Sequence, residues 1–334
     1  MRKIFYTIFI VTIICTAIPA LALTVSPARL EISGDPGVTI EAKIELFNEQ
    51  EGTRTFYTSF ENFEPSGDSG APQFIGAKDG LATWIQSENK VVVNSGARIS
   101  VPISITIPSN AEPGGHFAAI FFGSQEPGVR GEEQVSVGGK IGVLVLLRVN
   151  GAVTEGGGLL EFITKEKQKF YTELPVIFNY RINNTGGDRV VPLGDIRITN
   201  TLGLQSATLL ANKNEGSVLP NSARKFEVPW GQDLLTPNNK DSKEEQTGFF
   251  SRATAQWREF HFGWYTAKLN LTWGSTNQTA TDSYSFFVIP WQLLSIIFLV
   301  ILITGFVGKI ALKKYNRHII AQAQRIQRST QDIQ

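Results

Sequence analysis

The chain has 334 residues, of which 18% are charged, a single cysteine and a formal net charge of +1. Residues 23–288 hold 23 basic and 29 acidic side chains, and this acidic excess argues against nucleic acid, which binds a basic face. Because the only cysteine is Cys15, the rest of the chain has no disulfide, no thiol catalysis and no cysteine-ligated zinc. About 265 residues suffice for two domains of ordinary size.

The N-terminus is typical of an export signal. Arg2 and Lys3 precede an apolar run that ends in Pro-Ala-Leu-Ala, which predicts a signal peptide over residues 1–22. An uncleaved membrane anchor is the alternative interpretation.

Alternation of apolar and polar residues predicts a β-sandwich over residues 23–153. The clearest strand is 98–107, where every second residue is Ile or Val; Pro102 lacks an N–H, so we expect an edge or a bulge there. Further strands are expected at 39–46, 55–60, 91–93, 116–122 and 140–149, the last buried on both faces. Residues 62–83 are rich in Gly and Pro and are expected to form a long connection.

The run Glu155-Gly156-Gly157-Gly158 predicts a domain boundary, followed by a second β-sandwich over 159–288. Strands are expected at 175–183, 194–200, 222–230, 264–273 and 284–288, and no helix is expected before residue 289. The connection 232–261 carries Phe249, Phe250, Trp257 and Phe260. These aromatic residues either close the core of the second domain, or bind a partner or the membrane interface.

Residues 289–308 contain no charged side chain and are long enough to cross a bilayer as a helix, at about 1.5 Å per residue. A buried core helix is the alternative. The tail 309–334 opens with Lys309, Lys313, Lys314 and Arg317. By the positive-inside rule, this basic tail is cytoplasmic and residues 23–288 lie outside the cell membrane.

Catalytic signals are weak. The three histidines (His116, His261 and His318) have no metal-ligand spacing, and the sequence contains no G-x-S-x-G elbow and no phosphate-binding loop. We therefore expect no enzyme activity, no cofactor and no metal. A hydrolase built on an acid pair drawn from Glu61, Glu64 and Asp68 is the enzymatic alternative.

Aromatic residues in the first domain suggest a ligand surface. Trp84, His116 and Phe117 are candidates to line a groove in which a sugar ring stacks on an aromatic face. A lone Trp that completes the core of the sandwich is the competing interpretation of Trp84.

Several segments resemble the WxL-interacting protein family. In the first half they are SPARLE (26–31), Trp84-Ile85, VPISITIPSNAEPGGHFAAIFF (101–122) and LLRVNG (146–151). In the second half they are NTGG (184–187), PLGDI (192–196), VLP (218–220), Arg224, Trp230 and GWY (263–265). The resemblance implies a peptidoglycan-binding first domain with an immunoglobulin-like fold, a second β domain, a membrane helix and a basic tail.

The opening segment also resembles periplasmic pilus-assembly chaperones. In that family a basic pair on the first strand and the last long strand of the first domain holds the terminal carboxylate of a subunit. Arg29 and Arg148 stand in comparable places. The membrane helix argues against this resemblance, because such chaperones are soluble.

The sequence therefore predicts an all-β ectodomain of two immunoglobulin-like β-sandwiches followed by one transmembrane helix. The favoured function is non-enzymatic binding of cell-wall peptidoglycan or a neighbouring surface protein at the membrane. The alternative is an assembly factor that captures a protein subunit through Arg29 and Arg148.

Overall fold

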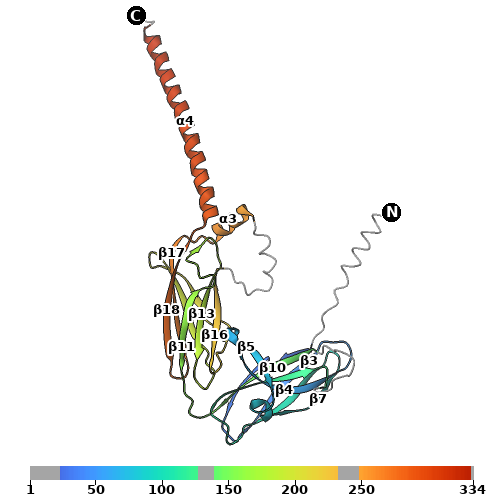
Figure 1. Ribbon diagram of the computed structural model, residues 1–334. Coiled ribbons are helices and arrows are strands. Elements are labelled where there is room, and N and C mark those ends of the chain that lie inside the picture. Colours follow the sequence, from blue (N-terminus) through green and yellow to red (C-terminus); the bar gives the residue numbers. More distant parts are fainter. Residues whose placement is uncertain (1–22, 127–138, 232–247, 332–334) are drawn as a thin grey trace, which may run out of the picture. The chain divides into compact units, whose positions relative to one another are not determined.

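The computed structural model describes residues 23–126, 139–231 and 248–331, and most of its elements are strands (Figure 1). The chain divides into two compact units, which we describe separately. The first unit comprises Met1–Gly158, Ile182–Val191 and Gly216–Lys225, and the second comprises Leu159–Arg181, Pro192–Glu215 and Phe226–Gln334. The signal peptide expected at 1–22 lies outside the described residues.

The first unit contains two sheets, with strand orders β1-β3-β8-β6 and β2-β10-β9-β4-β5; β7 also pairs with β4. The strands are β1 (Leu23–Ser26), β2 (Arg29–Gly34), β3 (Thr39–Asn48), β4 (Arg54–Ser66), β5 (Ala71–Gly76), β6 (Ile85–Ser87), β7 (Lys90–Val93), β8 (Arg98–Thr106), β9 (Gly114–Gly123) and β10 (Lys140–Val149). Two short helices, η1 (Gly67–Ser69) and α2 (Leu81–Trp84), lie between them. The expected immunoglobulin-like β-sandwich is confirmed.

The core of the first unit follows the alternation in the sequence. Ile44 and Leu46 of β3 face Val143, Val145 and other inward side chains of the second sheet, and all are fully buried. Neighbouring strand residues point to opposite faces, so one apolar residue in two fills the space between the sheets. Burial of this apolar surface is the main stabilising contribution to the sandwich.

Pro102 was expected at an edge or a bulge, but β8 is an inner strand with an unbroken register against β3. The neighbouring strand β6 pairs only with Ile103–Ile105 of β8. The carbonyl of Pro102 accepts a hydrogen bond from Ser87 Oγ at 3.1 Å, so the backbone of Pro102 faces the side of β6. Pro102 lies one residue beyond the last residue of β8 that pairs with β6. A residue without an N–H is therefore tolerated.

The expectation of a long connection at 62–83 was wrong over much of its length. β4 continues to Ser66 and pairs with β5, so the segment forms a β-hairpin around η1. Gly67 and Gly70 adopt positive φ angles in the turn, which explains the glycine content that disguised the hairpin as a loop.

The strands after residue 156 form a three-stranded sheet, β11-β13-β16, and a five-stranded sheet, β12-β18-β17-β14-β15. They are β11 (Gly157–Thr164), β12 (Phe170–Tyr171), β13 (Val176–Asn184), β14 (Leu193–Asn200), β15 (Gln205–Leu210), β16 (Ser222–Trp230), β17 (Gly263–Trp273) and β18 (Gln278–Val288). Val176, Phe178 and Tyr180 of β13 are fully buried, as the alternation predicts. Phe286 contacts Phe178 and Trp230 and joins the two layers, with ring centroids 5.6 Å apart in each pair.

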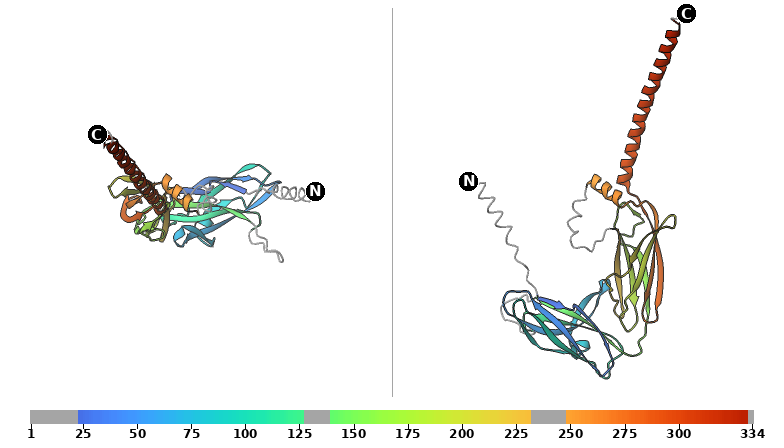
Figure 2. Two further views of the ribbon diagram at one scale, coloured as in Figure 1. Left: turned by 90° about the horizontal axis from the view of Figure 1, so that it is seen from above. Right: turned by 180° about the vertical axis from the view of Figure 1, so that it is seen from behind.

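Among its described residues, the second unit has two helices (Figures 1 and 2). The expectation of no helix before residue 289 was wrong, because α3 (Phe249–Arg258) forms within the long connection. The second helix, α4 (Trp291–Gln331), follows β18 after two residues and includes the predicted apolar span. Both views in Figure 2 place α3 beside the start of α4.

Candidate functional site

Trp84 and His116 meet at the end of the first sandwich. Their ring centroids are 4.7 Å apart, and His116 Nε2 is 2.9 Å from the carbonyl oxygen of Glu112. Trp84 is half-buried and packs against the core of the first unit. His116 therefore covers part of the indole that a sugar ring would use.

Phe117 lies on the opposite face of β9 from His116. This follows from the period of two, because Ala118, Ile120 and Phe122 share the inward face with His116, while Phe117 and Phe121 point outward. The three residues predicted to line one groove therefore do not share a surface.

Phe117 belongs instead to a row of four rings on the outer face of the larger sheet. We call Phe63, Phe74, Phe117 and Phe121 the aromatic surface. The centroid distances along the row are 5.9 Å for Phe117–Phe63, 6.3 Å for Phe63–Phe74 and 4.8 Å for Phe74–Phe121. The Phe63–Phe74 and Phe74–Phe121 pairs are edge-to-face and the Phe63–Phe117 pair is tilted, and contacts at these distances are favourable for aromatic pairs.

The β4–β5 hairpin builds this surface. The register between β4 and β5 shifts at Asn62/Phe63. The amide of Asn62 points inward, donates to the Asp79 carbonyl at 2.6 Å and accepts from Ala82 N at 2.9 Å. Phe63 is thereby directed to the outer face, where β5 brings Phe74 beside it.

A charged residue borders the aromatic surface. Lys140 Nζ lies 4.0 Å from the centroid of Phe121 and 2.7 Å from Glu61 Oε1. The cation contributes a cation–π contact while the carboxylate neutralises its charge. The surface is therefore apolar and nearly uncharged at this border.

The outermost strand of the sheet carries the exposed part of this surface. β5 ends the strand order, and its side chains Phe74 and Ile75 are 38% and 50% exposed. Among the described residues, no strand pairs with the other edge of β5. An unpaired edge beside exposed apolar side chains is a template for an added strand.

Arg29 and Arg148 lie on adjacent parallel strands but not side by side. Arg29 pairs in register with Leu144, four residues before Arg148, so about 13 Å separates their backbones. Each already has a carboxylate partner: Glu31 is 2.8 Å from Arg29, and Asp188 of the same compact unit is 3.2 Å from Arg148. Glu31 also pairs with Arg189.

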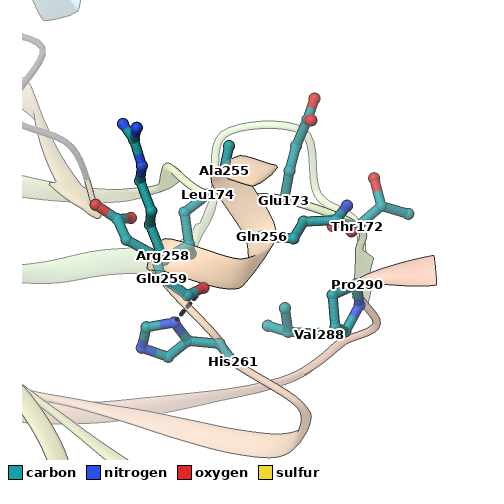
Figure 3. A pocket seen from close by; sticks show the side chains of 10 residues that line it. All are labelled: Thr172, Glu173, Leu174, Ala255, Gln256, Arg258, Glu259, His261, Val288 and Pro290. Carbon is teal, nitrogen blue, oxygen red and sulfur yellow. Dashed lines mark hydrogen bonds between the residues drawn. The ribbon is translucent and has the colours of Figure 1, made fainter. Parts of the chain in front are cut away.

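A small hollow lies between α3 and the strands of the second unit (Figure 3). Its volume is about 100 Å³, and it is lined by Thr172, Glu173, Leu174, Ala255, Gln256, Arg258, Glu259, His261, Val288 and Pro290. His261 Nδ1 lies 3.2 Å from the Glu259 carbonyl, and the ring packs on Trp230. Ligand pockets usually exceed about 300 Å³, so this hollow suits a few water molecules rather than a glycan.

Three ionisable groups in the described part of the second unit have shifted pKa values. Burial raises the pKa of Tyr171 to about 12 and also raises that of Tyr265. Burial works to raise the pKa of Asp195, but the hydrogen bonds from Arg197 and Asn270 outweigh it and hold the pKa below its usual value. All three groups belong to the second unit, whereas the aromatic surface belongs to the first, so we assign them to stability.

One helix in the described part of the chain is long and apolar enough to cross a membrane, Trp291–Ile320. Lys309, Lys313, Lys314 and Arg317 project from its second half and are exposed. Sequence reasoning found this helix and Phe117, but it missed Phe63 and Phe74. The signal for Phe63 was present in the alternation of residues 54–66, and the glycine-rich turn hid the short strand that carries Phe74.

No protein-family profile and no curated protein matches the sequence. Solved structures that are similar include the class 5 fimbriae chaperone CfaA, at 13% identity, with 78% of this chain and 98% of that chain covered and a TM-score of 0.36. The CupB2 chaperone of Pseudomonas aeruginosa has 9% identity, 79% and 100% coverage and a TM-score of 0.32. The CsuC–CsuE chaperone–tip subunit complex of Acinetobacter baumannii has 12% identity, 61% and 89% coverage and a TM-score of 0.32. Likenesses with TM-scores below 0.5 carry no functional information about this chain.

Proposed function

We propose that the chain is a membrane-anchored binding protein of the cell envelope that holds a protein partner at its first β-sandwich. In this proposal α4 crosses the membrane, and an extended, apolar segment of the partner binds along β5. The observation that carries the proposal is the unpaired edge of β5 beside the exposed side chains of Phe74 and Ile75.

Strand addition supplies both parts of such recognition. The free backbone N–H and C=O groups of an edge strand provide affinity, and alternate side-chain positions provide specificity. β5 has the sequence APQFIG and contains no charged residue that would repel a second strand. Pro72 has no N–H, so we expect the partner to pair chiefly with residues 73–76.

Two other ligand classes have less support. Cell-wall glycan would stack on Trp84 in our sequence prediction, yet His116 and the core already contact that indole. Capture of a terminal carboxylate by Arg29 and Arg148 would first have to displace Glu31 and Asp188. Membership of the WxL-interacting protein family is also a proposal, and the order of two β-sandwiches and one apolar helix supports it.

Site-specific photocrosslinking in native membranes tests the proposal. A photoreactive phenylalanine analogue replaces Phe74 in the full chain, and Val92, 54% exposed on β7, is the matched control position. We expect a polypeptide adduct at position 74 and none at 92. Phe74→Asp should abolish capture of the identified partner, whereas Val92→Asp should leave it intact.

Two results would contradict the proposal. Retention of the full chain on purified peptidoglycan, with no polypeptide adduct at position 74, would favour the glycan ligand. Loss of capture in the Arg29→Ala/Arg148→Ala variant, with Phe74→Asp unaffected, would favour the chaperone-like alternative.

A further inference from the structure

α3 presents its large apolar side chains outward, which is the reverse of a helix on a soluble domain. Ala253 and Gln256 are buried against the second unit, while Phe250 and Trp257 are 75% and 69% exposed. Residues 250, 254 and 257 lie on one face, since their spacings of three and four match the helical period. A surface helix normally turns its apolar face to the core and its polar face to water.

α3 is held at the first turn of α4 by two buried amides. Gln256 Nε2 donates to Gln292 Oε1 at 2.5 Å and to the Thr172 carbonyl at 3.0 Å. Gln256 Oε1 accepts from Leu293 N at 3.0 Å, which satisfies one of the backbone donors left unpaired at the start of a helix. Phe249 adds an edge-to-face contact with Trp291 at 5.7 Å.

A second aromatic group lies at the same end of the unit. Trp264 and Phe287 are partners in the β17–β18 register, one pair from the end of β18, and their rings are 5.2 Å apart. Phe170 and Phe262 each contact Phe287. Since α4 starts three residues after β18 ends, these rings lie at the level of its first turn.

Exposed apolar side chains concentrate at this end. In the described part of the second unit before α4, those at this end are Phe170, Leu202, Leu204, Phe249, Phe250, Trp257, Phe260, Phe262 and Trp264. Only Leu160, Leu193 and Leu210 are exposed elsewhere in the same part. Contiguous exposed apolar surface marks a site of contact with a protein or a membrane.

The position of this surface favours the membrane as its occupant. The surface is continuous with α4, whose own side chains Phe298, Leu299 and Val300 are exposed. Trp and other aromatic residues are enriched where a helix enters the headgroup region, because their rings suit its mixed polarity. Arg258 and Glu259 are both exposed beside the rings, so the contact is mainly apolar rather than electrostatic.

We propose that α3 and the rings around it form an interfacial anchor that seats in the headgroup region of the bilayer that α4 crosses. This inference rests on the membrane anchoring in the proposed function. A helix of this kind buries its apolar face about 5–10 Å into the boundary between headgroups and acyl chains. It therefore fixes the orientation of the second unit at the membrane, which a single helix leaves free.

Lipid quenching of a fluorophore tests the anchor in the full chain reconstituted in nanodiscs. Cys15→Ser removes the single native cysteine, and an environment-sensitive NBD label is placed on Thr254→Cys, which lies on the outward face of α3 and leaves the rings intact. Thr279→Cys, about 30 Å along β18 from its end, is the control, and Val300→Cys reports on α4. Lipid doxyl-labelled near the headgroup should reduce fluorescence at position 254 roughly twofold and leave 279 unchanged.

Substitution of the rings completes the test. Phe250→Ser/Trp257→Ser should lower quenching at position 254 to the level at 279. The matched pair Leu193→Ser/Leu210→Ser, which also removes exposed apolar side chains, should not.

Three results would overturn the inference. Quenching at position 300 by lipid doxyl-labelled deep in the acyl chain, without quenching at 254, would leave the membrane helix standing and refute the anchor. An absence of quenching at both positions would refute both the membrane helix and the interfacial anchor. A blue-shifted but lipid-insensitive label at 254 would show that protein, either a partner or a second copy, covers α3.

Discussion

Gln256 joins α3 to the rest of the second unit, so its replacement by leucine should release the helix. The side chain is 5% exposed and makes three hydrogen bonds, to Thr172, Gln292 and Leu293. Leucine has a similar size but neither donates nor accepts. The substitution therefore leaves the buried amide of Gln292, the backbone N–H of Leu293 and the partly accessible carbonyl of Thr172 without these partners.

The size of the free-energy cost follows from the number of polar groups that lose their hydrogen-bond partner. A buried polar group that loses its partner costs about 1–3 kcal/mol. Water from the adjacent hollow can reach part of this site, because Gln256 itself lines the hollow. We therefore expect a total cost of about 3 kcal/mol, which corresponds to roughly a 100-fold larger population of the opened helix.

Hydrogen exchange of the α3 amides measures this opening. Gln256→Leu should accelerate exchange over residues 252–258 by about that factor, while Gln205→Leu, at an exposed position, should leave it unchanged. The double variant Gln256→Leu/Gln292→Leu should be less destabilised than the sum of the single variants by about 1 kcal/mol. Replacing both partners removes the unpaired amide that each single variant leaves.

An unchanged exchange rate in Gln256→Leu would refute this reasoning. It would mean that the aromatic contact between Phe249 and Trp291 holds α3 without the amides. Strict additivity in the double variant would show that the two side chains do not interact.

Three further predictions concern stability. Asn48→Ala should cost about 2–3 kcal/mol, because the buried amide of Asn48 makes hydrogen bonds with Val93, Gly52 and Gln50. The loss is measured as a lower unfolding temperature of the solubilised chain. Gly194→Ala should cost more than about 3 kcal/mol in the same assay, because a Cβ would lie 1.9 Å from the Asn270 carbonyl oxygen and φ is +148°. For Tyr171, burial raises the pKa to about 12, while the unfolded phenol ionises near pH 10. Stability present below pH 10 should therefore fall by about 2–3 kcal/mol as the pH rises to 12, and Tyr171→Phe should flatten that part of the profile.

Each of these predictions has a control. Asn110→Ala removes an exposed amide and should change the free energy of unfolding by less than about 0.5 kcal/mol. Gly248→Ala places a Cβ in open space and should be equally mild. An alkaline profile of Tyr171→Phe that matches the parent chain would show that another group, such as Tyr265, causes the loss.

Many strands could be predicted because alternation is a local property. Ile99, Val101 and Ile103 must share a face once the segment is extended, whatever the rest of the fold does. The same reasoning located Phe178 and Tyr180 in the second core. The apolar span before the basic tail was equally visible, since it depends only on length and composition.

α3 could not be predicted in this way. Its sequence, FFSRATAQWR, places the large apolar residues outward and small or polar residues inward, so the usual helical pattern of burial is inverted. At ten residues it is also shorter than a helix that forms unaided in water. Contacts of Gln256 with residues far along the chain hold α3 in place, and no local sequence pattern predicts these contacts.

The aromatic surface shows which features the local sequence determines and which depend on the tertiary structure. Alternation places His116 and Phe117 on opposite faces, although we expected them to line one groove, and the apolar run already defines α4. Only the folded sheet brings Phe63 beside Phe117 and Phe74 beside Phe121, because that neighbourhood depends on which strands pair and in which register. Pairing is decided by the fit of the whole core, which no single segment encodes. For the same reason, only the tertiary structure shows that β5 is left with an open edge.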